Sequence, residues 1–167
     1  MEISEFTGVA RTHTPEIEIA LRLALATLLG AAIGVEREMR DRPAGLKTHM
    51  LTALAAAVFT VITFEIFELV RGLDPKSSAD PIRVIEAVTA GVAFLAAGTI
   101  IQSRGRVQGL TTGAGMWMAG AIGVACGGGY YALALMAAAL SVGIFVVINR
   151  LEERILSRGD RRGGESE

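Results

Sequence analysis

Cysteine and histidine are scarce in this sequence, and their scarcity excludes several kinds of site. Cys126 is the only cysteine, so the chain forms neither an intrachain disulfide nor a cysteine-based metal cluster. We expect this cysteine to be a small buried apolar residue. The two histidines, His13 and His49, have no Ser, Cys or carboxylate partner at the spacing of a catalytic motif. The sequence therefore predicts no enzyme and no cofactor.

Aromatic residues and evenly spread charges are also lacking. Hydrophobic residues make up 51% of the 167 residues, but aromatic residues only 5%. No charged residue occurs in 50–64, 87–103 or 107–149, and the last run is 43 residues long. Because a hydrocarbon core of about 30 Å needs roughly 20 helical residues to cross it, that run can hold two spans with a turn at the glycines 127–129. A soluble bundle would show a polar face on each helix, and these segments show none.

The sequence therefore predicts an all-α integral membrane protein, a compact bundle of about five transmembrane helices. We place the spans at about 17–35, 46–70, 82–102, 108–125 and 130–150. Residues 1–16 form an external segment, 17–150 the membrane domain, and 151–167 a basic, polar cytoplasmic tail. We expect the tail to be disordered after Arg158, because it is polar and rich in glycine.

Lysine and arginine are divided unevenly between the two sides of such a bundle. One side holds eleven, namely Arg37, Arg40, Arg42, Lys47, Arg104, Arg106, Arg150, Arg154, Arg158, Arg161 and Arg162. The other side holds four, namely Arg11, Arg71, Lys76 and Arg83. Because cytoplasmic loops carry the excess of positive charge, we predict that the N-terminus lies outside the cytoplasm and the C-terminus inside it.

Small residues recur at every fourth position in two of the predicted spans. They are Ala26, Gly30 and Gly34 in the first span, and Gly115, Ala119, Gly123 and Gly127 in the fourth. This spacing lets two helix backbones approach closely in lipid. It predicts a tight bundle and leaves open whether the contacts lie within one chain or between copies in a homo-oligomer.

The segment 34–51, between the first two spans, is dense in charge. Pro43 cannot continue a helix and Gly45 permits a turn, so we expect the second helix to begin near Leu46. Taken alone, the segment fits an anchor whose basic residues meet anionic lipid headgroups. A helix start at 109–112 lies on the same predicted face, where its backbone N–H groups are suited to an anion. A helix cap with core packing explains 109–112 equally well.

Two motifs in this order resemble the signature of the MgtC/SapB family of bacterial membrane proteins. The first comprises Glu36, Arg37, Glu38, Arg42, Pro43, Ala44, Gly45, Leu46, Lys47, Thr48 and His49. The second comprises Arg83, Gly91, Phe94, Leu95, Ala97, Gly98, Gly105, Val107, Gly109, Leu110, Thr111, Thr112 and Trp117. The chain departs from the family pattern at Ala87, Ala93, Ala96, Gln108 and Gly113. The resemblance runs from Leu21 to about Arg150 and is to the family's membrane domain.

The resemblance implies a multi-pass protein of the bacterial inner membrane, linked to growth under magnesium limitation and, in pathogens, to virulence. The family's best-known member is thought to bind and restrain the proton-translocating ATP synthase. On that basis we expect a non-enzymatic regulator with a membrane-protein partner, the ATP synthase being the implied one. Its informative surface would be the segment 36–49 with the turn 105–112. We expect the lipid bilayer, and no nucleic acid, among its partners.

Carboxylates near the predicted outer surface leave other functions open. Glu65, Glu68 and Glu86 are candidates for a cation-attracting vestibule, or for metal binding, in a transporter or channel. The alternative is a set of ion pairs, Glu18 with Arg22, Glu68 with Arg71 and Arg83 with Glu86, each spaced three or four residues apart. The spacing favours ion pairs, and the lack of a clear internal repeat disfavours transport. A structural subunit of a larger membrane complex is a third possibility.

Overall fold

The computed structural model describes residues 12–74, 80–103 and 106–163, and the side chains of 12–74, 80–100 and 107–151. Its helices are α2 (Glu16–Glu38), α3 (Leu46–Leu73), α4 (Ile82–Thr99), α5 (Leu110–Gly127) and α6 (Tyr131–Gly163). All five are long and apolar enough to cross a membrane, α6 through its segment Tyr131–Leu151. The prediction of an all-α membrane bundle is confirmed. The predictions for 1–11, 75–79, 104–105 and 164–167 fall outside the described residues.

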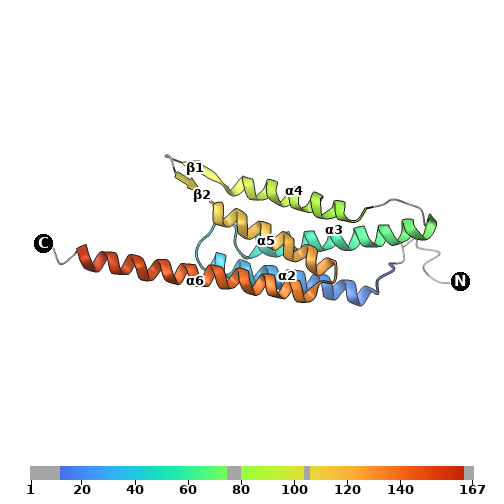
Figure 1. Ribbon diagram of the computed structural model, residues 1–167, viewed down its shortest axis with the longest axis horizontal. Helices are drawn as coiled ribbons and strands as arrows, with labels where there is room; N and C mark the ends of the chain where they lie inside the picture. Colours follow the sequence, from blue (N-terminus) through green and yellow to red (C-terminus); the bar gives the residue numbers. More distant parts are fainter. Residues whose placement is uncertain (1–11, 75–79, 104–105, 164–167) are drawn as a thin grey trace.

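Successive helices run in opposite directions along the bundle (Figure 1). One end carries the α2–α3 loop, the strands β1 (Ile101–Ser103) and β2 (Arg106–Gln108), and the last part of α6, which projects beyond its neighbours. We call this the inner end and the opposite one the outer end. Charge counting assigns the cytoplasm to the inner end, and that orientation stays a prediction.

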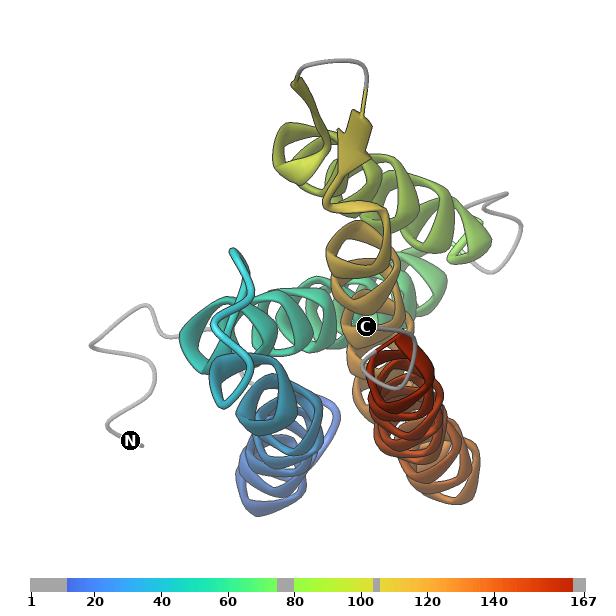
Figure 2. The same ribbon diagram turned by 90° about the vertical axis from the view of Figure 1, so that its left-hand side faces the viewer.

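Helix α5 lies at the centre of the bundle, in contact with each of the other four helices (Figure 2). Its small residues make this possible. A Cβ added at Gly123 would collide with the carbonyl oxygen of Ala53 on α3, and one added at Gly127 would lie 2.6 Å from the carbonyl oxygen of Ala57. The predicted tight packing through small residues is therefore confirmed, and these contacts lie within one chain.

The connection between α4 and α5 differs from the prediction. A helix was expected through residue 102, but α4 ends at Thr99, and Ile101–Ser103 pairs antiparallel with Arg106–Gln108. Thr99, Ile100 and Ile101 are β-branched, which favours extended backbone over helix. Gly109, with φ of 87°, then leads into α5, a conformation that glycine adopts without strain.

Helix α6 is longer than expected. It continues to Gly163, so the prediction of disorder after Arg158 is wrong up to that residue. Leucine, glutamate and arginine supply most of residues 151–158, and all three are strong helix formers. At its other end α6 follows the predicted glycine turn, because α5 ends at Gly127 and α6 begins at Tyr131. Cys126, beside this turn, is fully buried as predicted.

Candidate functional site: a buried polar junction

The loop between α2 and α3 is held by the residues of the first motif. Helix α2 ends at Glu38, whose carboxylate accepts a hydrogen bond of 2.9 Å from the backbone N–H of Leu46. A Cβ at Gly45 would collide with that carboxylate, and a Cβ at Gly34 would lie 2.7 Å from the Cα of Leu46. The two helices therefore meet closely at this loop, and the predicted start of α3 at Leu46 is confirmed.

Two polar side chains of the motif, Arg37 and His49, turn into the bundle. Arg37 keeps 2% of its surface exposed and His49 none. The Arg37 guanidinium lies 4.6 Å from the ring centre of Phe145 on α6, where a cation is attracted to the ring face. Its Nη2 donates to Thr112 Oγ1 on α5 at a long 3.5 Å. The Nδ1 of His49 lies 2.8 Å from the carbonyl oxygen of Gly45.

Glu36 connects this pair to the last helix. Its Oε1 accepts a hydrogen bond of 2.6 Å from Asn149 Nδ2 on α6 and lies 3.0 Å from Arg40 Nε. Its Oε2 lies 3.7 Å from Arg37 Nη1. We call this set the polar junction: Glu36, Arg37, Arg40, His49, Thr112, Phe145 and Asn149. It joins α2, α3, α5 and α6 near the inner end.

The buried polar atoms of the polar junction are not all hydrogen-bonded to described residues. Glu36 is its only carboxylate, against the guanidinium groups of Arg37 and Arg40. Among the described residues no hydrogen-bond partner reaches Glu36 Oε2, Arg37 Nε or His49 Nε2. Buried charges and unpaired polar atoms cost several kcal/mol unless they find partners, so this junction is an expensive feature of the fold. One of these atoms is a donor, Arg37 Nε, and two can accept, Glu36 Oε2 and His49 Nε2, and none of the three has a hydrogen-bond partner in the described part of the chain.

The other predicted signature residues lie around the junction or away from it. Arg42, Pro43, Lys47 and Thr111 are exposed, while Thr48 and Gly109 are half-buried. Trp117 lies further along α5 and is 49% exposed. Arg83 lies in the first turn of α4, at the outer end and far from the junction. The structure therefore gathers Glu36, Arg37, His49 and Thr112 from the predicted set, and leaves Arg83 and Trp117 apart.

Three members of the junction were not among the predicted signature residues: Arg40, which lies within the predicted segment 36–49, and Phe145 and Asn149, which lie outside it. Asn149 is a polar residue at the end of an apolar span, and polar residues in spans usually face the bundle interior. That signal was available in the sequence. The sequence gives no such signal for Phe145, because an aromatic side chain in a span can face lipid as well as the bundle interior.

Among the outer carboxylates, Glu65 is bound by the backbone of the segment before α2. Glu65 accepts hydrogen bonds from the backbone N–H groups of His13 and Thr14, at 2.5 and 3.0 Å. The part of the chain that the structure describes holds no group of three or more His, Cys, Asp or Glu able to bind a metal ion. Glu65 and Glu68 lie on α3 and Glu86 lies on α4, and the cation vestibule stays a prediction.

One of the three predicted ion pairs is present. Glu18 Oε1 lies 2.5 Å from Arg22 Nη2, and Arg22 also donates to the carbonyl oxygen of Gly127 at 2.8 Å. Within 12–74 and 80–100 the other two proposed pairs, Glu68 with Arg71 and Arg83 with Glu86, do not form. Those four side chains are exposed, and an exposed pair gains little from contact.

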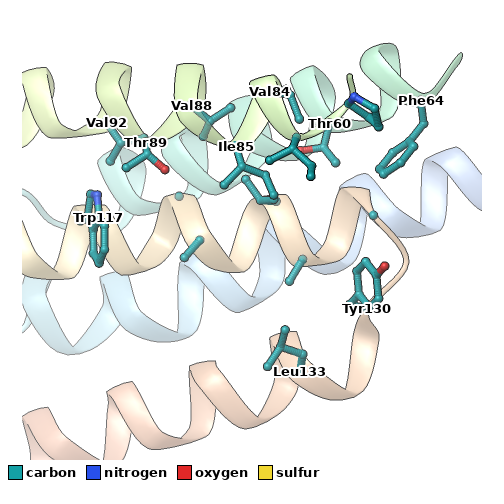
Figure 3. Close-up of a pocket in the computed structure, with 17 residues that line it drawn as sticks. Thr60, Phe64, Val84, Ile85, Val88, Thr89, Val92, Trp117, Tyr130 and Leu133 are labelled. Atoms are coloured by element: carbon teal, nitrogen blue, oxygen red, sulfur yellow. The ribbon is translucent and has the colours of Figure 1, made fainter. Parts of the chain in front are cut away.

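An apolar groove lies at the outer half of the bundle, between α3, α4 and α5 (Figure 3). Its volume is about 640 Å³, and none of the described residues that line it is charged. Phe64, Val88, Trp117 and Tyr130 point toward it (Figure 3). The groove exists because α4 packs mainly on α5 and touches α3 little.

Comparison with known proteins identifies the family. A sequence model of the MgtC family matches residues 23–154. The chain belongs to the MgtC family. The resemblance seen in the two motifs is thereby confirmed, and the range matched to the MgtC family contains every residue of the polar junction.

Several MgtC-family relatives share about a third of their aligned residues with this chain. The "Putative magnesium transporter YhiD" of Escherichia coli (strain K12) is 36% identical over 141 residues, 84% of this chain and 65% of that protein. "Protein MgtC" of Brucella abortus (strain 2308) is 36% identical over 149 residues, 89% of this chain and 59% of that protein. An uncharacterised protein of Haemophilus influenzae is 30% identical over 163 residues, 97% of this chain and 68% of that protein. The chain thus spans about three fifths to two thirds of their length. No solved structure matches it significantly.

Proposed function

We propose that this chain is a non-enzymatic regulator of the bacterial cytoplasmic membrane that acts by binding a membrane-protein partner. Its role is adaptation to magnesium limitation or to virulence-type stress, as the family resemblance implies. The proton-translocating ATP synthase is the partner to test first, for the same reason.

The observation that carries this proposal is the division of the first motif between buried and exposed residues. Arg37 and His49 are anchored inside the bundle, whereas Asp41, Arg42 and Lys47 face outward within the same ten or so residues. A charged loop held rigid by buried anchors loses little conformational entropy when it binds. Charges at the rim of such a surface select the partner and speed association.

Burial of the polar junction also favours binding over catalysis. The side chains that could take part in acid–base chemistry are enclosed by four helices, namely Glu36, Arg37 and His49. A substrate has no open path to them, since Arg37 and His49 have almost no exposed surface. The loop surface, in contrast, is open to a macromolecule.

A charge reversal on the loop tests the proposal. In a strain lacking the gene, wild-type protein should restore growth in limiting magnesium and alter proton-driven ATP synthesis in inverted membrane vesicles. Arg42→Glu should restore neither, because a repulsive charge at an interface costs on the order of ten-fold or more in affinity. Arg71→Glu, an equally exposed arginine at the outer end, is the matched control and should behave as wild type.

Each result of this experiment points to one conclusion. Immunoblots of the membrane fraction establish that both variants reach wild-type levels. If the wild-type protein restores growth without any change in ATP synthesis, the partner is a membrane protein other than the ATP synthase. Full activity of Arg42→Glu in both assays would contradict the assignment of the loop as the docking surface.

Cation transport is the second candidate, because the relative from Escherichia coli is named as a magnesium transporter. Magnesium flux into proteoliposomes that contain the purified protein tests it directly. Transport predicts flux above that of empty liposomes and its loss in Glu65→Gln, Glu68→Gln or Glu86→Gln. The regulator proposal predicts no flux and normal growth with all three variants.

A further inference from the structure

His49 is fully buried but keeps one ring nitrogen free. Its Nδ1 lies 2.8 Å from the carbonyl oxygen of Gly45, which can only accept, so Nδ1 carries the proton. In the neutral ring Nε2 is then an acceptor. Among the described residues nothing hydrogen-bonds to Nε2. The backbone of α3 therefore fixes His49 as a base whose lone pair points into the bundle.

No carboxylate of the described residues lies within hydrogen-bond distance of this lone pair. Helix α2 and the turn after it contribute Arg37 and Arg40, together with Glu36, whose Oε1 is bound by Asn149 and Arg40 and whose Oε2 lies 3.7 Å from Arg37 Nη1. Helix α5 contributes Gly115, where an added Cβ would lie 3.0 Å from Nε2, and the neutral Thr112. Helix α6 contributes Phe145 and Asn149, which are also neutral. The other charged residues of the loop, Glu38, Asp41, Arg42 and Lys47, are exposed. The charge that acts on the buried ring is the positive charge of Arg37, and no carboxylate in the described part of the chain is hydrogen-bonded to the ring.

We propose that His49 is a proton-binding site and that proton uptake loosens the polar junction. A proton from the aqueous phase adds to Nε2, no bond breaks, and the ring becomes a cation with a second N–H donor. In the packed junction no acceptor from the described residues lies within hydrogen-bond distance of that nitrogen, and the new charge adds to that of Arg37. Both effects oppose the packed state. They are relieved only when the start of α3 moves away from α2 and α5.

Close packing converts this local repulsion into movement of a helix. The carbonyl oxygen of His49 itself would lie 2.7 Å from a Cβ at Gly30 of α2, and Gly115 of α5 approaches its ring. The backbone of His49 therefore cannot approach α2 more closely, and the ring packs against the backbone of α5. Proton binding at His49 is therefore coupled to separation of the α2–α3–α5 contact. Neither the proton nor the helix movement requires that the loop bind a partner, so this proposal can hold or fail apart from the proposed function.

The two histidines allow a direct test on the full chain in detergent micelles or nanodiscs. Histidine labelled with ¹⁵N gives two ring systems, and His13→Gln assigns them. The state of each ring is followed from pH 8 to pH 5.5, together with amide hydrogen exchange of residues 46–53, corrected for the intrinsic rate. His49→Asn is the matched variant, because its side-chain N–H can still reach the Gly45 carbonyl but does not titrate.

The expected result is a neutral His49 with the proton on Nδ1 at pH 8. Below about pH 6.5, uptake of one proton on opening should lower the protection of residues 46–53 by up to about ten-fold per pH unit. His13→Gln should keep this loss of protection and His49→Asn should abolish it. A His49 ring that stays neutral to pH 5.5 with constant protection overturns the proposal. A ring that becomes charged without loss of protection overturns it as well, and both outcomes are readable in the wild type if His49→Asn fails to fold.

Discussion

The seam between α3 and α5 and the contact surface of α4 are built in different ways. In the seam, Gly123 and Gly127 bring the backbones of α3 and α5 together more closely than any side chain would allow. On α4 only Val88, Val92 and Ala96 are buried, and a Cβ added at Gly91 or Gly98 would meet nothing within 4 Å. Glycine thus has two roles: in α5 it permits a close contact between helices, and in α4 it lies on an open surface.

Hydropathy does not explain this difference. The span of α5 has a mean hydropathy of 1.2 and 61% of it is buried, whereas the span of α4 has a higher mean hydropathy of 1.5 and only 17% is buried. Lipid solvates apolar side chains as well as a protein interior does, so hydropathy cannot draw helices together in a membrane. Close backbone packing and polar contacts between helices decide which helix becomes central.

The largest effect should come from removing the only carboxylate of the polar junction. Glu36→Ala leaves Arg37, Arg40 and Asn149 without their shared acceptor. Breaking a buried charged network costs about 3–5 kcal/mol, and we expect that loss in the free energy of unfolding. Unfolding in mixed micelles with increasing SDS, followed by circular dichroism, measures it.

Glu36→Gln is the control for this prediction, since its amide oxygen can still accept from Asn149 and should preserve at least half of the stability that Glu36→Ala loses. Equal stability of Glu36→Ala and the wild type would mean that the junction does not hold the four helices together.

A methyl group in the seam should have the next largest effect. The Cβ of Gly123→Ala would collide with the Ala53 carbonyl oxygen and lie 2.8 Å from the Ala56 side chain. Neither neighbour is a flexible chain end, so the backbones of α3 and α5 must separate. Overpacking of this kind costs about 1–3 kcal/mol, measured by the same SDS titration. A variant as stable as the wild type would show that the seam can relax and that small residues are not required there.

The helices could be predicted from the sequence because the bilayer imposes their length. Charge-free runs such as 107–149 leave no alternative to spanning helices once loops are excluded from lipid. The β1–β2 hairpin could not be predicted in the same way. Ile100 and Ile101 continue the apolar run of α4, and a strand of three residues is too short for a period of two to be recognised.

The polar junction was predicted only in part, for a physical reason. The motif singled out Arg37 and His49, but a charged side chain next to a span usually reaches toward water. Arg37 turns inward because its guanidinium contacts the ring of Phe145 and donates to Thr112. Both residues belong to helices distant in sequence. Sequence spacing reports which residues share a helix face, and it cannot report which helix lies opposite.

The smallest effect, and one of opposite sign, is expected on α4. Gly91→Ala makes the same change as Gly123→Ala, but its methyl group enters open space. Alanine stabilises a helix interior over glycine by up to about 1 kcal/mol, so the free energy of unfolding should rise by a few tenths of a kcal/mol up to that value. Gly98→Ala, equally open, is the replicate. A loss of stability in Gly91→Ala would mean that a second helix, from another copy or a partner, packs on this face in the membrane. The contrast between α5 and α4 would then be one between contacts within the chain and contacts beyond it.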